Sequence, residues 1–248
     1  MTELELIIDF HKSAERQGPG SKEETLKALK LTGLSQTSGL KIADIGCGAG
    51  SQTLTLAENI SGNIIAVDLF DEFLDELNAR AISSGVQDRI RTLNCSMEDL
   101  PFEAELDIIW SEGAIYNMGF RSGVNKWKDH LKPGGILAVS EAIWLTSSRP
   151  EDIDEFWNRE YPEIDTNSEK IRVLEESGYS VEGNFVVSES SWIDNYYIPM
   201  EHRFADFLEK HQNSELASKI VEEHKAEIEL YHKYKAYYSY GFYIAKKL

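Results

Sequence analysis

The sequence has little positive charge. Its 248 residues include 25 lysines and arginines against 43 aspartates and glutamates, which gives a formal net charge of −18 at pH 7. A negative field of this size repels the phosphates of nucleic acids. We therefore expect no nucleic-acid partner.

Cysteines and long apolar runs are scarce as well. Cys47 and Cys95 stand in neither a metal-type nor a redox-type spacing, which predicts reduced thiols and no metal site. No apolar run is long enough to span a bilayer. The first ten residues include acidic side chains where a secretion signal requires basic ones. We expect a cytoplasmic protein without a membrane span.

The middle of the chain alternates between strand and helix patterns. Short apolar runs predict strands, and the stretches between them predict helices. The strands are expected at residues 41–46, 63–69, 89–95, 106–111 and 136–143, and the helices at 51–60, 71–85 and 125–131. This alternation is typical of βαβ units in a parallel sheet. The proline and glycines of LKPGG, residues 131–135, favour a turn before the fifth strand.

The last third of the chain has a different pattern. Helices are predicted at 169–178 and from Met200 to about Tyr234, and a strand at 179–190. In residues 238–245, large apolar side chains stand at every second position, which predicts another strand. The two late strands are therefore expected to flank a helical insertion. The acidic and aromatic segment 145–167 shows no clear strand, and we expect a loop or lid there.

The N-terminal segment is expected to hold two helices. Thr2–Ala14 has an amphipathic pattern, and Ser21 followed three residues later by Glu24 has the spacing of a capping box. Arg16 has no local structural role. We hypothesise that Arg16 and Gly20 belong to a lid in which the guanidinium binds a ligand carboxylate. The alternative is a surface arginine on a fraying helix.

A glycine-rich turn follows the first strand. The stretch ADIGCGAG places Asp44 at the strand end and glycines at positions 46, 48 and 50. Glycines let backbone approach a ligand where a Cβ would clash, although a tight strand-to-helix turn explains them equally. Asp68 ends the next strand, where an acid can accept both hydroxyls of a ribose or else stabilise the start of the next helix. Together the two features favour a nucleoside-containing cofactor.

The ordered motifs resemble those of a known family. DIGCGAGSQT, VDL, CSMEDLPF, LDIIWSEGA and LKPGGIL, spread over about Leu40–Ile143, are similar to the motifs of class I S-adenosylmethionine-dependent methyltransferases. The small-molecule and ubiquinone/menaquinone type is the most similar. A nicotinamide-binding turn prefers G-x-G-x-x-G, whereas here the third glycine comes one place early.

The resemblance implies an α/β fold. It predicts a Rossmann-like, doubly wound sheet of seven strands with its last strand antiparallel, a helical insertion and an N-terminal helical lid. We expect a single domain over residues 1–248. In it, 1–38 form the lid, 39–144 bind the cofactor, and 145–248 supply the substrate-side loops, the insertion and the late strands.

The resemblance also implies which residues bind S-adenosyl-L-methionine. The methionyl part would meet Asp44, Gly46, Cys47 and Gly48, the ribose Asp68, the adenine Leu69, Ser96 and Met97, and the sulfonium side Ser111 and Glu112. Many relatives have an aspartate where Ser96 stands, so only a hydroxyl is left here to bond the adenine amine. The acids suit a cofactor that carries a sulfonium and an amino group.

The acceptor is expected to be a small molecule. The fourth strand ends in WSEGAIYN and not in the acid-Pro-Pro-aromatic motif typical of enzymes that methylate nucleic-acid amines. A base is needed only where the nucleophile must lose a proton, and Glu112, His202 and Glu141 are the candidates. The aromatic residues of segment 191–204 form either a substrate wall or ordinary core, with core packing favoured.

Three functions remain open at this point. The first is methyl transfer to a small molecule by in-line displacement. The second is an NAD-type oxidoreductase, and the third is a non-catalytic S-adenosylmethionine-binding regulatory protein. The apolar face of the last helix, with Ile220, Val221 and Ile228, is either core or the interface of a homodimer.

Overall fold

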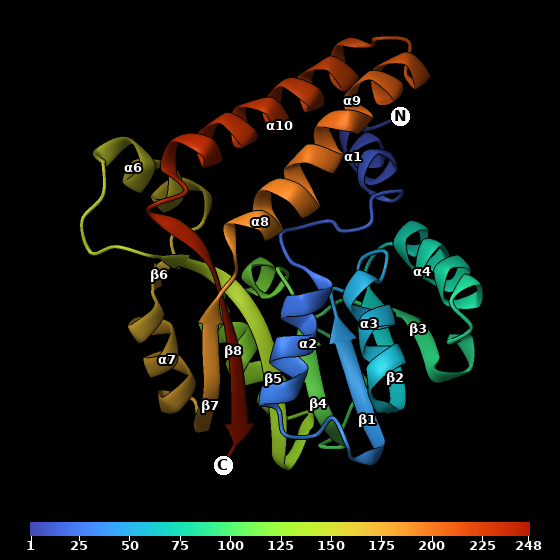
Figure 1. Cartoon of the computed structure of the whole chain (residues 1–248), viewed down its shortest axis with the longest axis vertical. Coiled ribbons are helices and arrows are strands. Elements are labelled where there is room, and N and C mark those ends of the chain that lie inside the picture. Colours follow the sequence, from blue (N-terminus) through green and yellow to red (C-terminus); the bar gives the residue numbers. More distant parts are fainter.

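Seven strands form one continuous sheet in the order β3-β2-β1-β4-β5-β8-β7. The computed structural model describes residues 1–248. The strands are β1 (Ser38–Ile45), β2 (Ser61–Asp68), β3 (Ile90–Asn94), β4 (Leu106–Ser111), β5 (Leu131–Trp144), β7 (Tyr179–Val186) and β8 (Tyr238–Lys247), with the short β6 (Asp165–Thr166) paired to the end of β5. β8 is antiparallel to both of its neighbours. The expected Rossmann-like sheet with an antiparallel last strand is confirmed (Figure 1).

Helices cover both faces of this sheet. They are α2 (Lys22–Leu31), α3 (Ser51–Asn59), α4 (Asp71–Ser83), α5 (Phe120–Lys128) and α7 (Asn167–Glu176), with short 3-10 turns η1 (Gln87–Arg89) and η2 (Ile115–Met118). The helix α6 (Glu151–Glu160) lies beyond the ends of the strands, near the end of α10 (Glu215–Tyr234), as Figure 1 shows. One buried cluster joins α2 and α3 to the sheet through residues such as Leu29, Leu56 and Ile42. A second joins α5 and α7 to the other face through Trp127 and Leu174. The fold is therefore doubly wound.

Strand order reverses between β1 and β4. β1 pairs with β2 on one side and with β4 on the other, both in parallel. The connections after β1 and β4 consequently leave the sheet in opposite directions, and a crevice opens at the carboxyl ends of the two strands. This is where an open α/β sheet binds its ligands.

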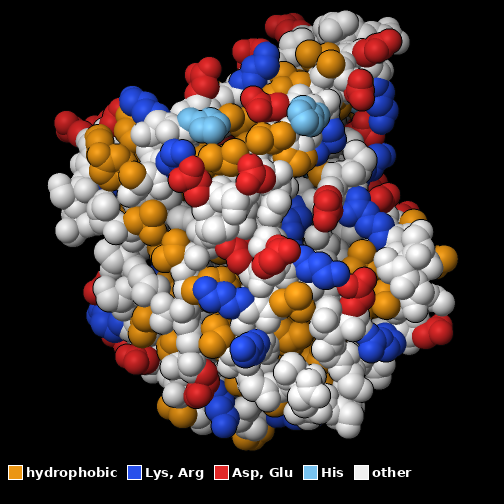
Figure 2. All heavy atoms as spheres, viewed as in Figure 1, with side chains coloured by type: hydrophobic (Ala, Val, Ile, Leu, Met, Phe, Trp, Pro, Cys, Tyr) orange, Lys and Arg blue, Asp and Glu red, His pale blue; other side chains and the backbone are white.

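Additional helices lie over the carboxyl ends of the strands (Figure 1). They are α1 (Glu3–His11), α8 (Glu189–Trp192), the π-helical turn η3 (Ile193–Tyr197), α9 (Ile198–Lys210) and α10 (Glu215–Tyr234). We call residues 3–11 and 189–234 the helical cap. Phe10 of α1 stacks on Phe204 of α9, and Asp9 accepts hydrogen bonds from Lys210 and His211. Figure 2 shows charged side chains of both signs over this part of the surface, with apolar ones between them.

The start of α2 ties the N-terminal segment to the late part of the chain. Ser21 caps the helix by accepting from the Glu24 N–H at 3.1 Å, as its spacing predicts. Glu24 does not complete the capping box, however. Its carboxylate accepts instead from the Ser188 N–H and the Ser191 hydroxyl at the start of α8. The Asn195 amide donates to the Gly20 carbonyl at 3.0 Å, which strengthens the same junction.

Several expected boundaries were wrong. The strand expected at 179–190 ends at Val186, ahead of α8, and the helix expected from Met200 to about Tyr234 is divided into α9 and α10. Segment 145–167 contains α6 and β6 in place of a loop. Acidic residues in the first turn of α6 favour the start of this helix. Its Ile153 is buried in the hydrophobic cluster that the helical cap forms, which we call the cap core. The segment LKPGG is not a turn ahead of the fifth strand. β5 starts at Leu131, and an irregularity in its pairing with β4, next to Gly134 with its positive φ, absorbs the glycines.

The apolar face of α10 is buried within the chain. Ile220, Val221, Ile228 and Tyr231 all belong to the cap core and are at most 5% exposed. Core packing is therefore the role of this face. None of the helices combines the length and apolar character needed to cross a bilayer.

Gly50 allows a test of how tightly the turn after β1 is packed. Its φ is +85°, and a Cβ there would lie 2.1 Å from Leu77 Cδ1 of α4. We expect Gly50→Ala to lower the free energy of unfolding by about 3 kcal/mol, from left-handed strain and overpacking together. Urea denaturation measures this.

Gly85→Ala is the matched control. Gly85 also has a left-handed φ, of +69°, but a Cβ there meets nothing within 4 Å. The left-handed strain alone should lower the free energy of unfolding by about 1 kcal/mol. Equal losses in the two variants would show that the contact with Leu77 does not constrain the turn.

Candidate functional site

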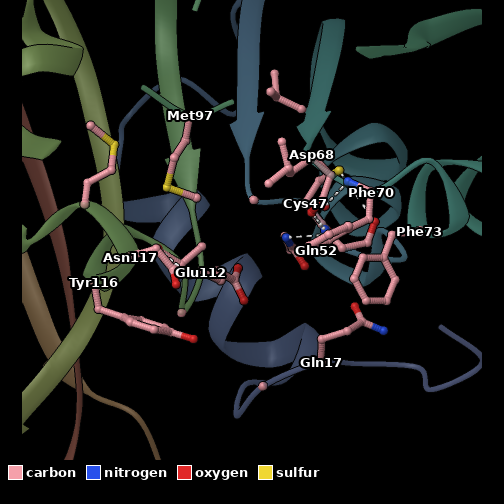
Figure 3. A pocket seen from close by; sticks show the side chains of 18 of the residues that line it. Gln17, Cys47, Gln52, Asp68, Phe70, Phe73, Met97, Glu112, Tyr116 and Asn117 are labelled. Atoms are coloured by element: carbon pink, nitrogen blue, oxygen red, sulfur yellow. Dashed lines mark hydrogen bonds between the residues drawn. The ribbon is translucent and has the colours of Figure 1, made fainter. Parts of the chain in front are cut away.

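A cavity of about 450 Å³ lies at the carboxyl ends of β1, β2 and β4. It is lined by Arg16–Pro19, Gly46–Gly48, Gln52, Val67–Phe70, Phe73, Cys95–Glu98, Glu112–Ala114 and Tyr116–Met118. Figure 3 shows Phe70, Phe73 and Asp68 on one side of it and Tyr116, Asn117 and Met97 on the other. The N-terminal segment and the crevice of the sheet together enclose this space.

The glycine turn forms the floor of the cavity because side chains do not fit there. A Cβ on Gly46 would lie 2.4 Å from Ala114 Cβ, and one on Gly48 would lie 2.3 Å from Gln17 Oε1. Both glycines have left-handed φ angles, of +70° and +53°. The floor is therefore backbone, as the sequence predicts for a turn that meets a ligand.

Asp68 projects into the cavity from the end of β2. Its Oδ2 accepts from the Gly48 N–H at 2.9 Å, and its Oδ1 accepts from the Phe70 N–H at 3.1 Å. Burial raises the pKa of this carboxyl, although the backbone donors oppose the shift. The two bonds fix the carboxylate beside the glycine turn, and its bond to Phe70 also supports the start of α4.

Asp44 lies beneath the turn and does not line the cavity. It is fully buried and accepts from the Thr53 hydroxyl at 2.5 Å and, more distantly, from the Gln52 amide at 3.4 Å. Burial raises its pKa to about 7, and the nearby charge of Glu112 adds to the shift. The expectation that Asp44 meets a ligand directly does not fit, because its carboxylate fastens β1 to the start of α3.

A buried ion pair joins the N-terminal segment to the end of β4. Arg16 Nη1 lies 2.9 Å from Glu112 Oε2, and the two side chains are 7% and 6% exposed. Glu112 Oε1 also accepts from the Thr25 hydroxyl and the Trp110 indole N–H. Gly20 leaves room for the pair, since a Cβ there would lie 2.6 Å from Arg16 Nη1.

This pair changes the expected roles of both residues. Arg16 lines the cavity, so it is not a surface arginine, but its partner in the structure is Glu112. Three donors occupy the Glu112 carboxylate, which makes it a poor general base. Its geometry fits charge compensation and positioning better.

Gln17 contacts the glycine turn, which the sequence did not indicate. Its Oε1 accepts from the Ala49 N–H at 2.9 Å, and its amide nitrogen donates to the His11 and Ala14 carbonyls. The side chain therefore holds the N-terminal segment against the glycine turn. A glutamine after an arginine carries no local signal for such a distant partner.

Apolar side chains form the side of the cavity next to β2 and β3. Leu69 is 58% exposed, and Phe70 and Phe73 face the cavity on this side, while Met97 faces it from the opposite side (Figure 3). The Trp127 indole donates to the Met97 carbonyl at 3.0 Å and holds this loop. Phe73 was missed in the sequence, although its spacing from Phe70 at the start of a helix could have indicated it.

Ser111 does not line the cavity either. It is fully buried, and its hydroxyl donates to the Ile45 carbonyl at 2.8 Å, which links the ends of β4 and β1. Ser96 does line the cavity, and its hydroxyl accepts from the Glu98 N–H at 3.2 Å. The two serines differ because Ser111 ends a central strand while Ser96 lies in the loop after β3.

The expected bases other than Glu112 lie away from the cavity. His202 is exposed on α9, and Glu141 is fully buried on β5 with Lys170 Nζ 3.8 Å from its carboxylate. Burial raises the pKa of Glu141 to about 7. The structure thus contradicts the placement of His202 in the site, because helix α9 directs this side chain to solvent.

The aromatic residues of segment 191–204 are mostly core. Trp192 and Tyr197 are buried in the cap cluster and do not line the cavity. Trp192 stacks on Tyr231 at 4.7 Å, which accounts for its burial by packing. No three or more histidine, cysteine, aspartate or glutamate side chains come together in a way that could hold a metal ion.

Comparison with known proteins agrees with this geometry. Residues 42–135 match a family described as a methyltransferase domain. A crystal structure of a SAM-dependent methyltransferase from Geobacter sulfurreducens, in complex with S-adenosyl-L-homocysteine, has a TM-score of 0.86 over 98% of both chains, at 19% identity. Residues 42–135 are therefore similar to a methyltransferase domain, and the whole chain has the fold of that S-adenosylmethionine-dependent enzyme.

Two curated proteins that are similar to this chain act on different acceptors, by their names. Erythromycin 3''-O-methyltransferase of Saccharopolyspora erythraea is 33% identical over 133 residues, which are 52% of this chain and 43% of that protein. Probable protein arginine N-methyltransferase 6 of Arabidopsis thaliana is 26% identical over 155 residues, which are 57% of this chain and 34% of that protein. The chain spans less than half of the length of either relative.

The buried Asp44 predicts a pH dependence of the stability of this protein. Its pKa is about 7 in the folded chain against 3.8 as the ordinary value. Between these values the folded state binds more protons than the unfolded state, so this carboxyl makes stability fall as pH rises. We expect the stability of the wild type minus that of Asp44→Asn to decrease from pH 4.5 to 7, by at most about 1.4 kcal/mol per pH unit.

Urea denaturation of both proteins at several pH values measures this difference. Subtracting the variant removes the titration of every other carboxyl, because asparagine cannot ionise. A difference that stays constant or grows with pH would contradict the raised pKa.

Proposed function

We propose that this methyltransferase transfers the methyl group of S-adenosylmethionine to a small-molecule acceptor by in-line displacement. The charge of the cavity is the observation that carries the proposal. Its lining contains three acids, Asp68, Glu98 and Glu112, and one base, Arg16, which is already paired with Glu112. Such a cavity suits a cofactor with a sulfonium and an amino group, and it suits a dinucleotide pyrophosphate poorly.

Within this proposal, different residues of the cavity bind different parts of the cofactor. Asp68 accepts the ribose hydroxyls, and Leu69, Ser96 and Met97 meet the adenine, joined by Phe73. The backbone of Gly46, Cys47 and Gly48 meets the methionyl part, with Arg16 and Glu112 at its charged end. Asp44, Ser111 and Gly20 act indirectly by holding the turn, the strand ends and the ion pair.

The bound cofactor supplies an electrophilic methyl group on a positively charged sulfur. The protein holds the two reactants in line and keeps water out. Gln17 and Arg16 serve the second task, because they fasten the N-terminal segment across the cavity. Of the segment 1–38 that the sequence predicts as a lid, residues 12–21 therefore serve that role, since α2 packs on the sheet. Tyr116 and Gly113 mark the end of the cavity left for the acceptor.

The two other functions make different predictions for binding. Calorimetric titration should show S-adenosylhomocysteine binding and no NAD binding. Transfer of a labelled methyl group to a metabolite extract should then yield labelled small molecules. Binding of NAD alone would favour an oxidoreductase. Binding of S-adenosylhomocysteine without methyl transfer would favour a regulatory protein. If an arginine-rich peptide is added and only that peptide is labelled, the acceptor is a protein.

Asp68 offers a direct test of the cofactor site. Asp68→Ala removes the proposed ribose acceptor, so we expect S-adenosylhomocysteine affinity to fall more than tenfold, or about 1.4 kcal/mol. Glu98→Gln removes the same charge from another lining position and should change affinity less than threefold. Similar losses in both variants would indicate a general charge effect, and unchanged affinity in Asp68→Ala would exclude the ribose contact.

A further inference from the structure

Tyr116 of η2 is the aromatic side chain at the acceptor end of the cavity. It lines the cavity and is 43% exposed, so its ring is free to meet a bound molecule. The other two aromatic rings of the lining, Phe70 and Phe73, lie on the opposite side (Figure 3). The cofactor contacts proposed above do not use Tyr116. What holds this ring in place therefore bears on how the acceptor fits.

Tyr161 packs against Tyr116 and does not itself line the cavity. The two ring centroids are 6.1 Å apart and the rings are inclined by 71°, close to the edge-to-face arrangement that aromatic pairs favour. Tyr161 is buried and belongs to the cap core. It is the first of residues 161–164, which connect α6 to β6. We call these four residues the α6–β6 loop.

The α6–β6 loop also holds the helix that follows Tyr116. Glu163 Oε2 accepts from the Arg121 N–H in the first turn of α5, at 3.3 Å. An acid is favoured at this end of a helix. Gly119, just before α5, has a left-handed φ of +78°, and a Cβ there would lie 2.4 Å from Glu163 Oε1. The missing side chain at Gly119 therefore lets the carboxylate reach the start of α5.

Lys170 of α7 lies at the centre of these contacts. Its Nζ donates to the Glu163 carbonyl at 2.7 Å. The same nitrogen lies 4.6 Å from the centroid of the Phe120 ring and 5.3 Å from that of the Tyr161 ring. Its ion-pair partner is Glu141 of β5, at 3.8 Å, and both side chains are buried. One ammonium group thus joins α7, β5, the start of α5 and the α6–β6 loop.

Stability does not explain the ion pair at Lys170. Burial takes both charges out of water, and at 3.8 Å the two groups are too far apart to recover that loss through a good hydrogen bond. Replacing a buried ion pair with uncharged side chains is often neutral or stabilising. The contacts of Lys170 fit a different role, which is to hold the α6–β6 loop in one position beside η2.

We propose that Tyr161 and Lys170 are positioning residues that set where the Tyr116 ring stands and thereby how tightly the acceptor binds; this rests on the proposed methyltransferase function. Both act through Tyr116, because neither lines the cavity. Loss of either lets the Tyr116 ring move, which weakens acceptor binding and leaves the transfer step itself largely unchanged. The cofactor contacts are not altered.

The Tyr161 ring is tested with a metabolite extract and labelled S-adenosylmethionine. For each protein we measure the maximal rate of labelling and the amount of extract that gives half of it. Tyr161→Leu should raise this amount at least fivefold and change the maximal rate less than twofold. Tyr161→Phe, which keeps the ring, should stay within twofold of the wild type. Phe156→Leu is the control, since Phe156 packs on Trp157 at 5.7 Å within α6, and it should also stay within twofold.

Lys170 is tested by removing both charges of the ion pair. Lys170→Met and Glu141→Gln in one chain leave no unpaired buried charge. This double variant should raise the half-saturating amount of extract at least fivefold and leave S-adenosylhomocysteine affinity within twofold. Lys128→Met is the matched control, because Lys128 Nζ also donates to a carbonyl at 2.7 Å, that of Ser177. It should change neither quantity.

The outcomes separate this assignment from the proposed function. An unchanged half-saturating amount in Tyr161→Leu or in the double variant, or an equal shift in its control, would overturn the assignment while leaving methyl transfer intact. A parallel loss of S-adenosylhomocysteine affinity would indicate a general role in folding and would overturn it as well. No labelled product from the wild type would overturn the proposed function and this inference with it.

Discussion

The tight turn after β1 is the constraint around which the site is organised. Its left-handed glycines leave no room for side chains, so backbone lies at the point where strand order reverses. Asp44 fixes this turn from below through Thr53, and Asp68 and Gln17 accept its N–H groups from two sides. Each of these contacts leaves the turn less freedom to open.

The helical cap depends on the same region although it is distant in sequence. α1 packs in the cap, while α2 packs on the sheet beside α3. The ten residues between them carry Arg16 and Gln17 across the cavity. Movement of the cap relative to the sheet would therefore strain the contacts of these two residues.

The sequence predicted the sheet, the glycine turn and Asp68 because local patterns encode them. Strand periodicity, glycine spacing and an acid at a strand end need no knowledge of distant neighbours. Asp44 and Ser111 were expected to line the cavity because both stand at strand ends. Only the packed structure shows that their side chains are buried and form hydrogen bonds within the protein. Periodicity does not report tertiary packing. The contact of Gln17 with the glycine turn, the position of Phe73 at the cavity and the exposure of His202 all depend on that packing.

The position of β8 has a consequence for how the protein is made. β8 is the last strand of the described chain, yet it lies between β5 and β7 and pairs with both. During synthesis β5 and β7 therefore stay exposed edges until β8 emerges, as does Glu24 until Ser191 has arrived. A nascent chain can form the parallel half of the sheet early, but the antiparallel half with β8 and β7 assembles late. Strands that are still unpaired at that stage are prone to aggregation.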